Sequence, residues 1–217
     1  SKELSIKIPL NNNSSPLTQA YIFNNSRWIL CGNDQKLYVF EKNTKKILYE
    51  IDVNDFDNEN TDYNIISFSL SNKNILLICC EFSLEPDDEN DDEETVRIQG
   101  EIYIYDIFEK ELLETNSLVG NEILMSKISN SGKYFFIVTN SEVSFWDISD
   151  GVNKELSFNE RSHEPKILHE FTKVRNFCFT NNEERLIIFG INNINNNFVE
   201  KLNIYSLPDL NLIYTHN

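Results

Sequence analysis

The sequence predicts an all-β protein built from four copies of one four-stranded antiparallel unit. Two series of similar segments alternate along the 217 residues, and no competing segment spaces its apolar residues with a helical period. We expect the units at roughly 17–51, 63–116, 123–158 and 174–215.

The first series predicts a strand, a tight turn and a second strand in each unit. Its members are "AYIFNNSRWILCG", "SFSLSNKNILLICC", "MSKISNSGKYFFIVT" and "NFCFTNNEERLIIFG". In each, an alternating strand ends just before a turn rich in Ser, Asn or Thr, at Phe23, Leu70, Ile128 and Phe179. The strand after the turn is mostly apolar, so we expect it to be buried on both faces.

The second series supplies the third and fourth strands. It comprises "KLYVFEKNTKKILYE", "EIYIYDIFEKELLE", "EVSFWDISDGVNKELS" and "KLNIYSLPDLNLIYT". Each begins with a charged residue, alternates, and reaches an aromatic residue followed by a short polar residue or an acid; the aromatics are Phe40, Tyr105, Trp146 and Tyr205. In "SEVSFWDISDG", Val143 and Phe145 should point one way and Ser144 and Trp146 the other.

Two units carry insertions between their middle strands. The second contains the acidic segment "EPDDENDDEE" at 85–94, and the fourth contains "NNINNNF". Insertions confined to one equivalent position are typical of surface loops on a repeated scaffold. We expect residues 85–94 to be such a loop.

Four-stranded sheets repeated radially are the blades of a β-propeller. The segments "CGNDQKLYVFE" at 31–41 and "TNSEVSFWDISDG" at 139–151 resemble motifs of the WD-repeat family. That resemblance implies that Trp146-Asp147 ends the third strand of a blade and that Asp150-Gly151 forms the hairpin to the outer strand. The motif is degenerate: the chain has one Trp-Asp dipeptide and no Gly-His dipeptide, and only Asp34 matches the family's turn acid clearly. The His–Asp–Ser–Trp hydrogen-bond network of the family's ideal repeats therefore cannot form in full.

The number of units bears on the size of the propeller. Propellers have between about four and eight blades, and the resemblance implies seven as the most frequent number. The last unit already has its outer strand in "LNLIYTH". We therefore expect residues 1–217 to form a single domain that is part of a larger propeller, completed by further blades in the same or another chain. A compact four-bladed ring is the alternative.

The charge of the chain favours basic protein partners. Its 19 Lys and Arg oppose 35 Asp and Glu, a net charge of −16, and the longest basic run is Lys45-Lys46. Such a chain repels phosphate backbones, so we expect no direct binding of nucleic acid. The candidate partner-binding residues are the eight acids of the acidic segment, which could instead serve solubility alone: Glu85, Asp87, Asp88, Glu89, Asp91, Asp92, Glu93 and Glu94.

The sequence offers no catalytic, cofactor or metal site. Cys31, Cys79, Cys80 and Cys178 lie in apolar strand-like runs without a CxxC motif, so we expect small core residues in a reducing compartment, with Cys79 and Cys80 on opposite faces. His163 and His169 flank "EPKIL", where loop or edge-strand histidines are favoured over a catalytic pair. The acidic segment and "DVNDFDNEN" at 52–60 lack the spacing of a calcium loop. No phosphate-binding Gly loop or G-x-S-x-G motif is present.

These observations predict a protein that is not an enzyme. We expect a non-catalytic scaffold that mediates protein–protein interactions within a multi-subunit intracellular complex. The alternative is a non-catalytic subunit of an RNA- or nucleic-acid-modifying enzyme complex. No apolar run is long enough to span a bilayer and no signal peptide opens the chain, so the expected location is the cytoplasm or nucleus.

Overall fold

The computed structural model describes residues 19–23, 28–32, 36–56, 63–84, 97–118, 121–148, 165–169, 171–194 and 197–216. Within these residues the regular structure is sixteen strands and one 3₁₀ turn, Val53–Asp55. The strands are β1 (Gln19–Phe23), β2 (Trp28–Gly32), β3 (Lys36–Glu41), β4 (Ile47–Asp52), β5 (Asn64–Leu70), β6 (Ile75–Leu84), β7 (Arg97–Asp106), β8 (Glu111–Leu118), β9 (Ile123–Ile128), β10 (Tyr134–Thr139), β11 (Val143–Asp147), β12 (Lys166–Ile167), β13 (Lys173–Phe179), β14 (Arg185–Ile194), β15 (Asn197–Ser206) and β16 (Asn211–His216).

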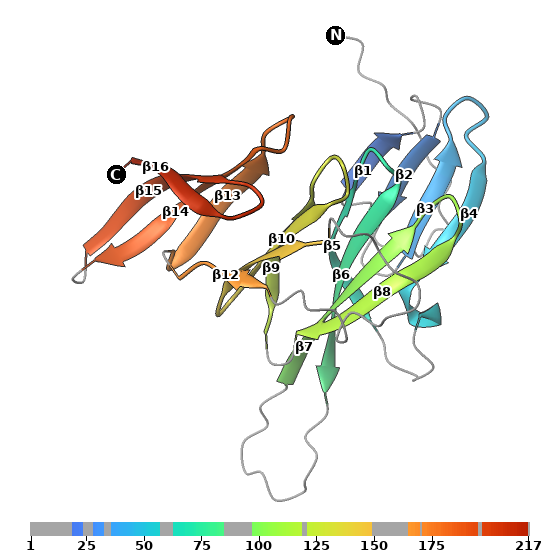
Figure 1. Ribbon diagram of the computed structural model, residues 1–217. Coiled ribbons are helices and arrows are strands. Elements are labelled where there is room, and N and C mark those ends of the chain that lie inside the picture. Colours follow the sequence, from blue (N-terminus) through green and yellow to red (C-terminus); the bar gives the residue numbers. More distant parts are fainter. Residues whose placement is uncertain are drawn as a thin grey trace, which may run out of the picture.

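The strands form four four-stranded sheets, each a simple antiparallel meander. The sheets follow one another in a row, with the first sheet (β1–β4) at one end and the fourth (β13–β16) at the other (Figure 1). This confirms the predicted all-β fold of four repeated units. The four predicted strand ends, Phe23, Leu70, Ile128 and Phe179, are the last residues of β1, β5, β9 and β13.

The third unit was predicted to end at residue 158, but the outer strand of the third sheet lies later in the chain. Strand β12 pairs with β11 through Ser144↔Ile167 and Phe145↔Lys166, and the Leu168 amide donates to the Val143 carbonyl at 2.8 Å. The third unit therefore reaches Ile167, because this later segment satisfies the free edge of β11. The predicted Asp150-Gly151 hairpin lies outside the described residues, as does Asp34.

The hydrophobic core consists of three layers, one between each pair of successive sheets. Leu30 and Val39 of the first sheet pack against the second, which turns Ile78 and Cys80 toward them. The opposite face of the second sheet presents Cys79 to the third. Alternation along β6 thus sends neighbouring cysteines into different layers, as predicted.

The segment "SEVSFWDISDG" of the second series follows the same alternation. Val143 and Phe145 contribute to the layer between the third and fourth sheets, whereas Trp146 lies in the layer toward the second sheet. The Trp146 Nε1 donates to the Ser144 hydroxyl at 3.3 Å. Ser144 and Trp146 therefore share a face of β11, as predicted.

The fourth sheet departs from two predictions. Strand β14 buries Leu186 and Ile188, but Phe189 on its other face is 36% exposed, so β14 is not buried on both faces as β10 is. Cys178 on β13 is exposed, so the prediction of a core residue was wrong there. Both residues lie on the face of the fourth sheet that points away from the third.

Candidate interaction site between the third and fourth sheets

The eight acids of the predicted partner-binding segment lie outside the described residues, but the structure describes the strands on either side. Strands β6 and β7 stay paired up to Leu84↔Arg97. Residues 85–96 therefore connect the two middle strands of the second sheet, at the end where the third sheet has its β10–β11 loop. A partner-binding role for this segment remains a prediction.

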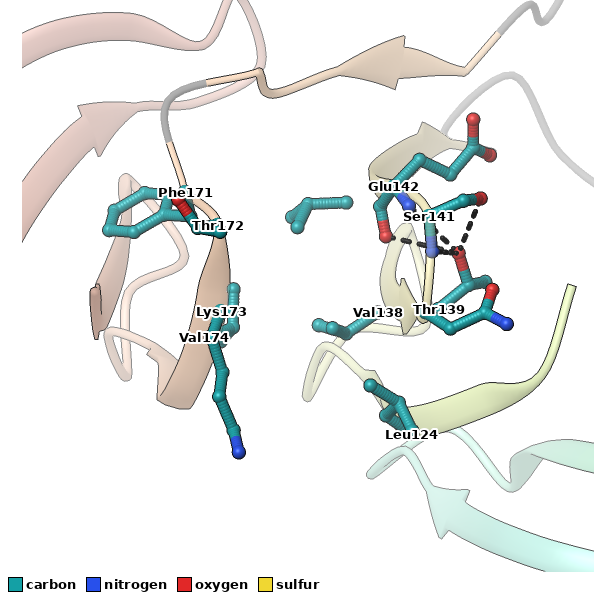
Figure 2. Close-up of a pocket in the computed structure, with 11 residues that line it drawn as sticks. Leu124, Val138, Thr139, Ser141, Glu142, Phe171, Thr172, Lys173 and Val174 are labelled. Carbon is teal, nitrogen blue, oxygen red and sulfur yellow. Dashed lines mark hydrogen bonds between the residues drawn. The ribbon is translucent and has the colours of Figure 1, made fainter. Parts of the chain in front are cut away.

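A cavity of about 260 Å³ opens at this same end, between the third and fourth sheets. Figure 2 shows the two sides of the cavity: Thr139, Ser141 and Glu142 of the β10–β11 loop face the segment from Phe171 to Val174. The cavity thus lies where a connection within one sheet meets the beginning of the next sheet.

The floor of the cavity is apolar. Val138 and Val143 of the third sheet and Phe171 and Val174 of the fourth are all buried and belong to the core layer between the two sheets. Leu124 at the edge of the cavity is 48% exposed. A side chain that enters the cavity would therefore meet hydrophobic surface at the bottom.

One wall is a tight loop organised by the Thr139 hydroxyl. This oxygen accepts the amides of Glu142 at 3.0 Å and Ser141 at 3.3 Å, while the Thr139 amide donates to the Glu142 carbonyl at 2.9 Å. Thr and Ser favour such turns because their hydroxyls bond nearby backbone groups. The Asn140 amide also donates to the Glu122 carbonyl at 3.0 Å, which fixes the loop to the start of β9.

The opposite wall is the entry into β13. The Thr172 amide donates to the Ile191 carbonyl at 2.8 Å, and the Thr172 hydroxyl accepts the Asn193 amide at 2.9 Å. Lys173 is exposed beside it, and Glu142 stands on the facing wall (Figure 2). The rim therefore carries one charge of each sign above the apolar floor.

The preceding junction, between the second and third sheets, has different residues at the positions equivalent to the cavity wall. The pairs Cys79↔Ile102 of the second sheet and Val138↔Val143 of the third occupy equivalent positions in the two middle strands. Two residues further along the second strand of each sheet, Glu81 therefore corresponds to Asn140. The Ile123 amide, at the start of the third sheet, donates to the Glu81 carboxylate across that junction.

Partial burial at this junction raises the pKa of the Glu81 carboxyl above its usual range. The backbone at Gly100 is closely approached from the third sheet. A Cβ on Gly100 would stand only 2.9 Å from the Asn121 carbonyl oxygen. The next junction has Asn140 and Ser141 at the equivalent positions, and there the cavity stays open.

The cavity is suited to non-covalent binding. Its lining includes hydroxyls from Thr139, Ser141 and Thr172 but neither His nor Cys. His169 is exposed in the β12–β13 connection, and His163 lies outside the described residues, so the structure does not describe the pair together. Among the described residues no group of three or more His, Cys, Asp or Glu is placed to hold a metal ion.

The buried thiols are also poor nucleophiles. Burial raises the pKa of Cys31 to about 12 and that of Cys79 to about 11. Because the thiolate is the reactive form, both side chains are protonated and inert at neutral pH. These two cysteines serve packing.

Comparison with solved structures identifies the fold. The chain superposes on the β-propeller domain of Cps50 (Swd1) from Myceliophteria thermophila with a TM-score of 0.59 and 12% sequence identity, over 97% of this chain and 57% of that one. It also superposes on the C-terminal WD40 domain of Sif2 with a TM-score of 0.54 and 12% identity, over 89% of this chain and 46% of that one. The fold is that of a WD40 β-propeller. Protein-family models and curated proteins give no match to the sequence.

The four sheets form an open part of a propeller rather than a closed ring. The chain spans only about half the length of the WD40 propeller domains that it matches. Its first and fourth sheets stand at opposite ends of an open row, so the compact four-bladed ring is not formed (Figure 1). In WD40 terms, the cavity lies between two adjacent blades. The described residues contain no helix that could cross a membrane.

Proposed function

We propose that this chain is a non-catalytic scaffold that binds other proteins within a multi-subunit intracellular complex. The observation that carries the proposal is the cavity between the third and fourth blades. It combines an apolar floor with a polar rim that is already held in place by its own hydrogen bonds. A preformed rim reduces the ordering cost of binding.

The partner inserts one aliphatic side chain between the two blades. Full burial of a Leu-sized side chain contributes about 1.5–3 kcal/mol. Glu142 and Lys173 then face the polar groups that flank this side chain in the partner. The acidic segment at 85–94, which connects strands at the same end of the propeller, favours partners with basic surfaces.

Site-specific photo-crosslinking tests this function. A photoreactive residue replaces exposed Lys173 at the cavity, and the matched control replaces exposed Asn181 in the turn at the opposite end of the same sheet. In extract from the source cells, the Lys173 variant is expected to crosslink to a defined protein that the Asn181 variant does not capture. Equal capture by both variants, or none by either, would overturn the proposal.

A second measurement ties binding to the cavity. Leu124→Asp places a charge at its apolar edge without disturbing a buried side chain. Affinity for the captured protein should fall by about tenfold or more, since a loss of about 1.4 kcal/mol corresponds to a factor of ten. Leu48→Asp on β4, which is similarly exposed at 42% but far from the cavity, should leave affinity unchanged.

If the chain instead served a nucleic-acid-modifying complex by touching RNA, a salt-dependent RNA affinity would appear.

A further inference from the structure

The β10–β11 hairpin of the third blade is shorter than the hairpins of the blades on either side of it. The three hairpins are aligned by their equivalent pairs, which are Cys79↔Ile102, Val138↔Val143 and Phe189↔Leu202. Two residues beyond its pair, the third blade turns back at Asn140 and Ser141, whereas its neighbours are still paired as strands. Beyond that level each neighbouring ladder continues, with Phe82↔Gln99, Ser83↔Ile98 and Leu84↔Arg97 in the second blade and Asn192↔Val199, Asn193↔Phe198 and Ile194↔Asn197 in the fourth.

The two longer hairpins form the walls of a trough above the shorter one. At about 3.3 Å per residue, the additional pairs raise each wall by about 10 Å. Successive sheets pack about 10 Å apart, so the backbones of the second and fourth blades are separated by about 20 Å. That separation leaves room for one further layer, and an α-helix with its side chains is about 10–12 Å across. We call the space above Asn140 and Ser141, between the described parts of the β6–β7 and β14–β15 hairpins, the trough.

One wall of the trough is the β6–β7 ladder. Cys79 faces the third blade, so alternation along β6 places Ser83 on the same face, four residues further on. Ile98, the register partner of Ser83, shares that face. Ser83 is exposed and Ile98 is 40% exposed, so this wall presents apolar surface to solvent.

The other wall is the β14–β15 ladder. Ile188 belongs to the core layer shared with the third blade, so Asn192 and its register partner Val199 point toward the trough. Both side chains are half-buried. Between the walls, the floor is the cavity described above, with exposed Leu124 at its edge (Figure 2). Apolar side chains therefore occur on both walls and on the floor.

The charges around the trough are segregated by sign. Glu122 and Glu142 belong to the third blade, and Glu122 is exposed beside the junction with the second. The lysines belong to the fourth blade: Lys173 is exposed at the cavity, and Lys201 lies on the same face of β15 as Val199. A ligand in the trough therefore meets acids toward the second blade and lysines toward the fourth.

We propose that the trough binds an amphipathic α-helix of the partner protein. This inference rests on the proposed binding at the cavity and specifies the structure of the partner. One aliphatic side chain of the helix enters the cavity. Residues three and four positions away lie on either side of it around the helix, so they reach Ile98 on one wall and Val199 on the other.

The charge pattern of the trough sets the orientation of the helix about its axis. Its basic residues lie toward Glu122 and Glu142, and its acidic residues lie toward Lys173 and Lys201. A helix with this pattern is apolar on the face that enters the trough and carries opposite charges on its two flanks.

An extended segment fits the trough less well than a helix. The walls present the faces of two sheets, and thus side chains, rather than strand edges. An extended segment would find few backbone partners there, whereas a helix satisfies its own backbone groups.

Crosslinking from both sides of the trough tests the proposal. A photoreactive residue at Ile98 is compared with the one at Lys173, which lies in a different blade, and with one at exposed Leu48 on β4 as the control. In extract from the source cells, the first two variants are expected to capture the same protein, and the Leu48 variant is not. Mass spectrometry should place the two crosslinks within about seven residues of one another in that protein, which is two turns of a helix.

A synthetic peptide then tests the helix directly. The probe is the crosslinked segment, with a length of about 15 residues so that a helix can form. Its far-ultraviolet circular dichroism should become helical when the chain is added. A central Pro should weaken its binding by at least about tenfold, because Pro breaks a helix interior, whereas Ala at the same position should not.

A matched pair of variants of the chain shows whether the wall takes part. Ile98→Asp should weaken binding of the peptide by about tenfold, because it places a charge against the apolar face of the helix. Leu48→Asp, at a similarly exposed position in the first blade, should leave binding unchanged. Thermal unfolding of both variants confirms that each remains folded.

The outcomes separate this inference from the proposed function. If neither Lys173 nor Ile98 captures a protein, both are overturned. If Lys173 captures a protein but Ile98 does not, the cavity binds a partner and the helix in the trough is overturned. A peptide that stays non-helical when bound, or that binds equally well with a central Pro, would also overturn the helix alone.

Discussion

At the residue scale, several residues of the hairpin turns adopt the left-handed backbone conformation, with positive φ. Asn74 and Gly132, with φ of 68° and 74°, are residue types that accept this conformation readily. Lys45, Lys110 and Leu210 occupy one equivalent position, before β4, β8 and β16, with φ of 56° to 57°. A long side chain has no preference for this region, so the geometry of the hairpin imposes it.

Lys45→Gly is expected to stabilise the protein. The Lys45 side chain is exposed, so little packing is lost, and removal of its Cβ relieves a conformation that costs an L-residue about 1–2 kcal/mol. After the entropy of Gly is deducted, the free energy of unfolding should rise by up to about 1 kcal/mol in urea denaturation. Lys46→Gly, next to it without a positive φ, should lower the same quantity. Equal effects of the two substitutions would contradict this explanation.

Trp146 is the residue whose substitution we expect to lower the free energy of unfolding most. It is 6% exposed and stacks on Phe135 with ring centroids 5.4 Å apart. Trp146→Ala should lower the free energy of unfolding by about 3–5 kcal/mol, the usual range for a core aromatic. Trp146→Phe keeps most of the stacked surface and should cost less. A loss below about 1 kcal/mol for Trp146→Ala would show that the ring contributes little to the layer.

At the element scale, the β6–β7 hairpin is a ladder of ten residue pairs that ends at Leu84↔Arg97. Its buried pairs lie near the other end, where Leu77 and Ile104 pack against the third blade. The described part of the hairpin is therefore packed mainly at this end, away from Leu84.

Replacing residues 85–94 by a short Gly-Ser linker should change the free energy of unfolding by less than about 1 kcal/mol, because loop-closure entropy depends only weakly on length. The control is Ile104→Ala at the base of the same hairpin. It removes a side chain that is 1% exposed and should cost about 2–5 kcal/mol in the same urea denaturation. A loss of several kcal/mol on linker replacement would mean that the acidic segment is packed or binds an ion.

At the scale of the whole molecule, the blades form an open row with an apolar layer at each junction and a net charge of −16. We expect a chain with this net charge to favour basic protein partners over nucleic acid. The acidic segment concentrates eight carboxylates in ten residues, so it makes the largest local contribution.

Changing its eight acids to Ser and Asn should slow association with the protein captured at Lys173. The effect should be seen at low salt and fade at moderate salt, because exposed charges are screened within about 10 Å at 0.1 M. The dissociation rate should change little, which stopped-flow or surface-binding kinetics would measure. An unchanged association rate at low salt would leave the segment with a role in solubility alone.

The sequence by itself determined the strands and the faces of their side chains. Alternation with a period of two placed Ser144 and Trp146 on one face and Cys79 and Cys80 on opposite faces, and the turn residues fixed the ends of β1, β5, β9 and β13. These features depend on neighbours within one hairpin, which a local pattern contains.

Tertiary structure alone decided what each face meets. Cys178 has the same apolar surroundings in sequence as Cys79, yet it is exposed because its face lies beyond the last junction. The cavity lies where Asn140 and Ser141 occupy the positions that Glu81 and Gly100 have at the preceding junction. The outer strand of the third blade likewise came from residues 166–167, selected by the free edge of β11. In each case the outcome depends on contacts between segments far apart in the chain, and a local pattern of apolar and polar residues does not specify which segments meet.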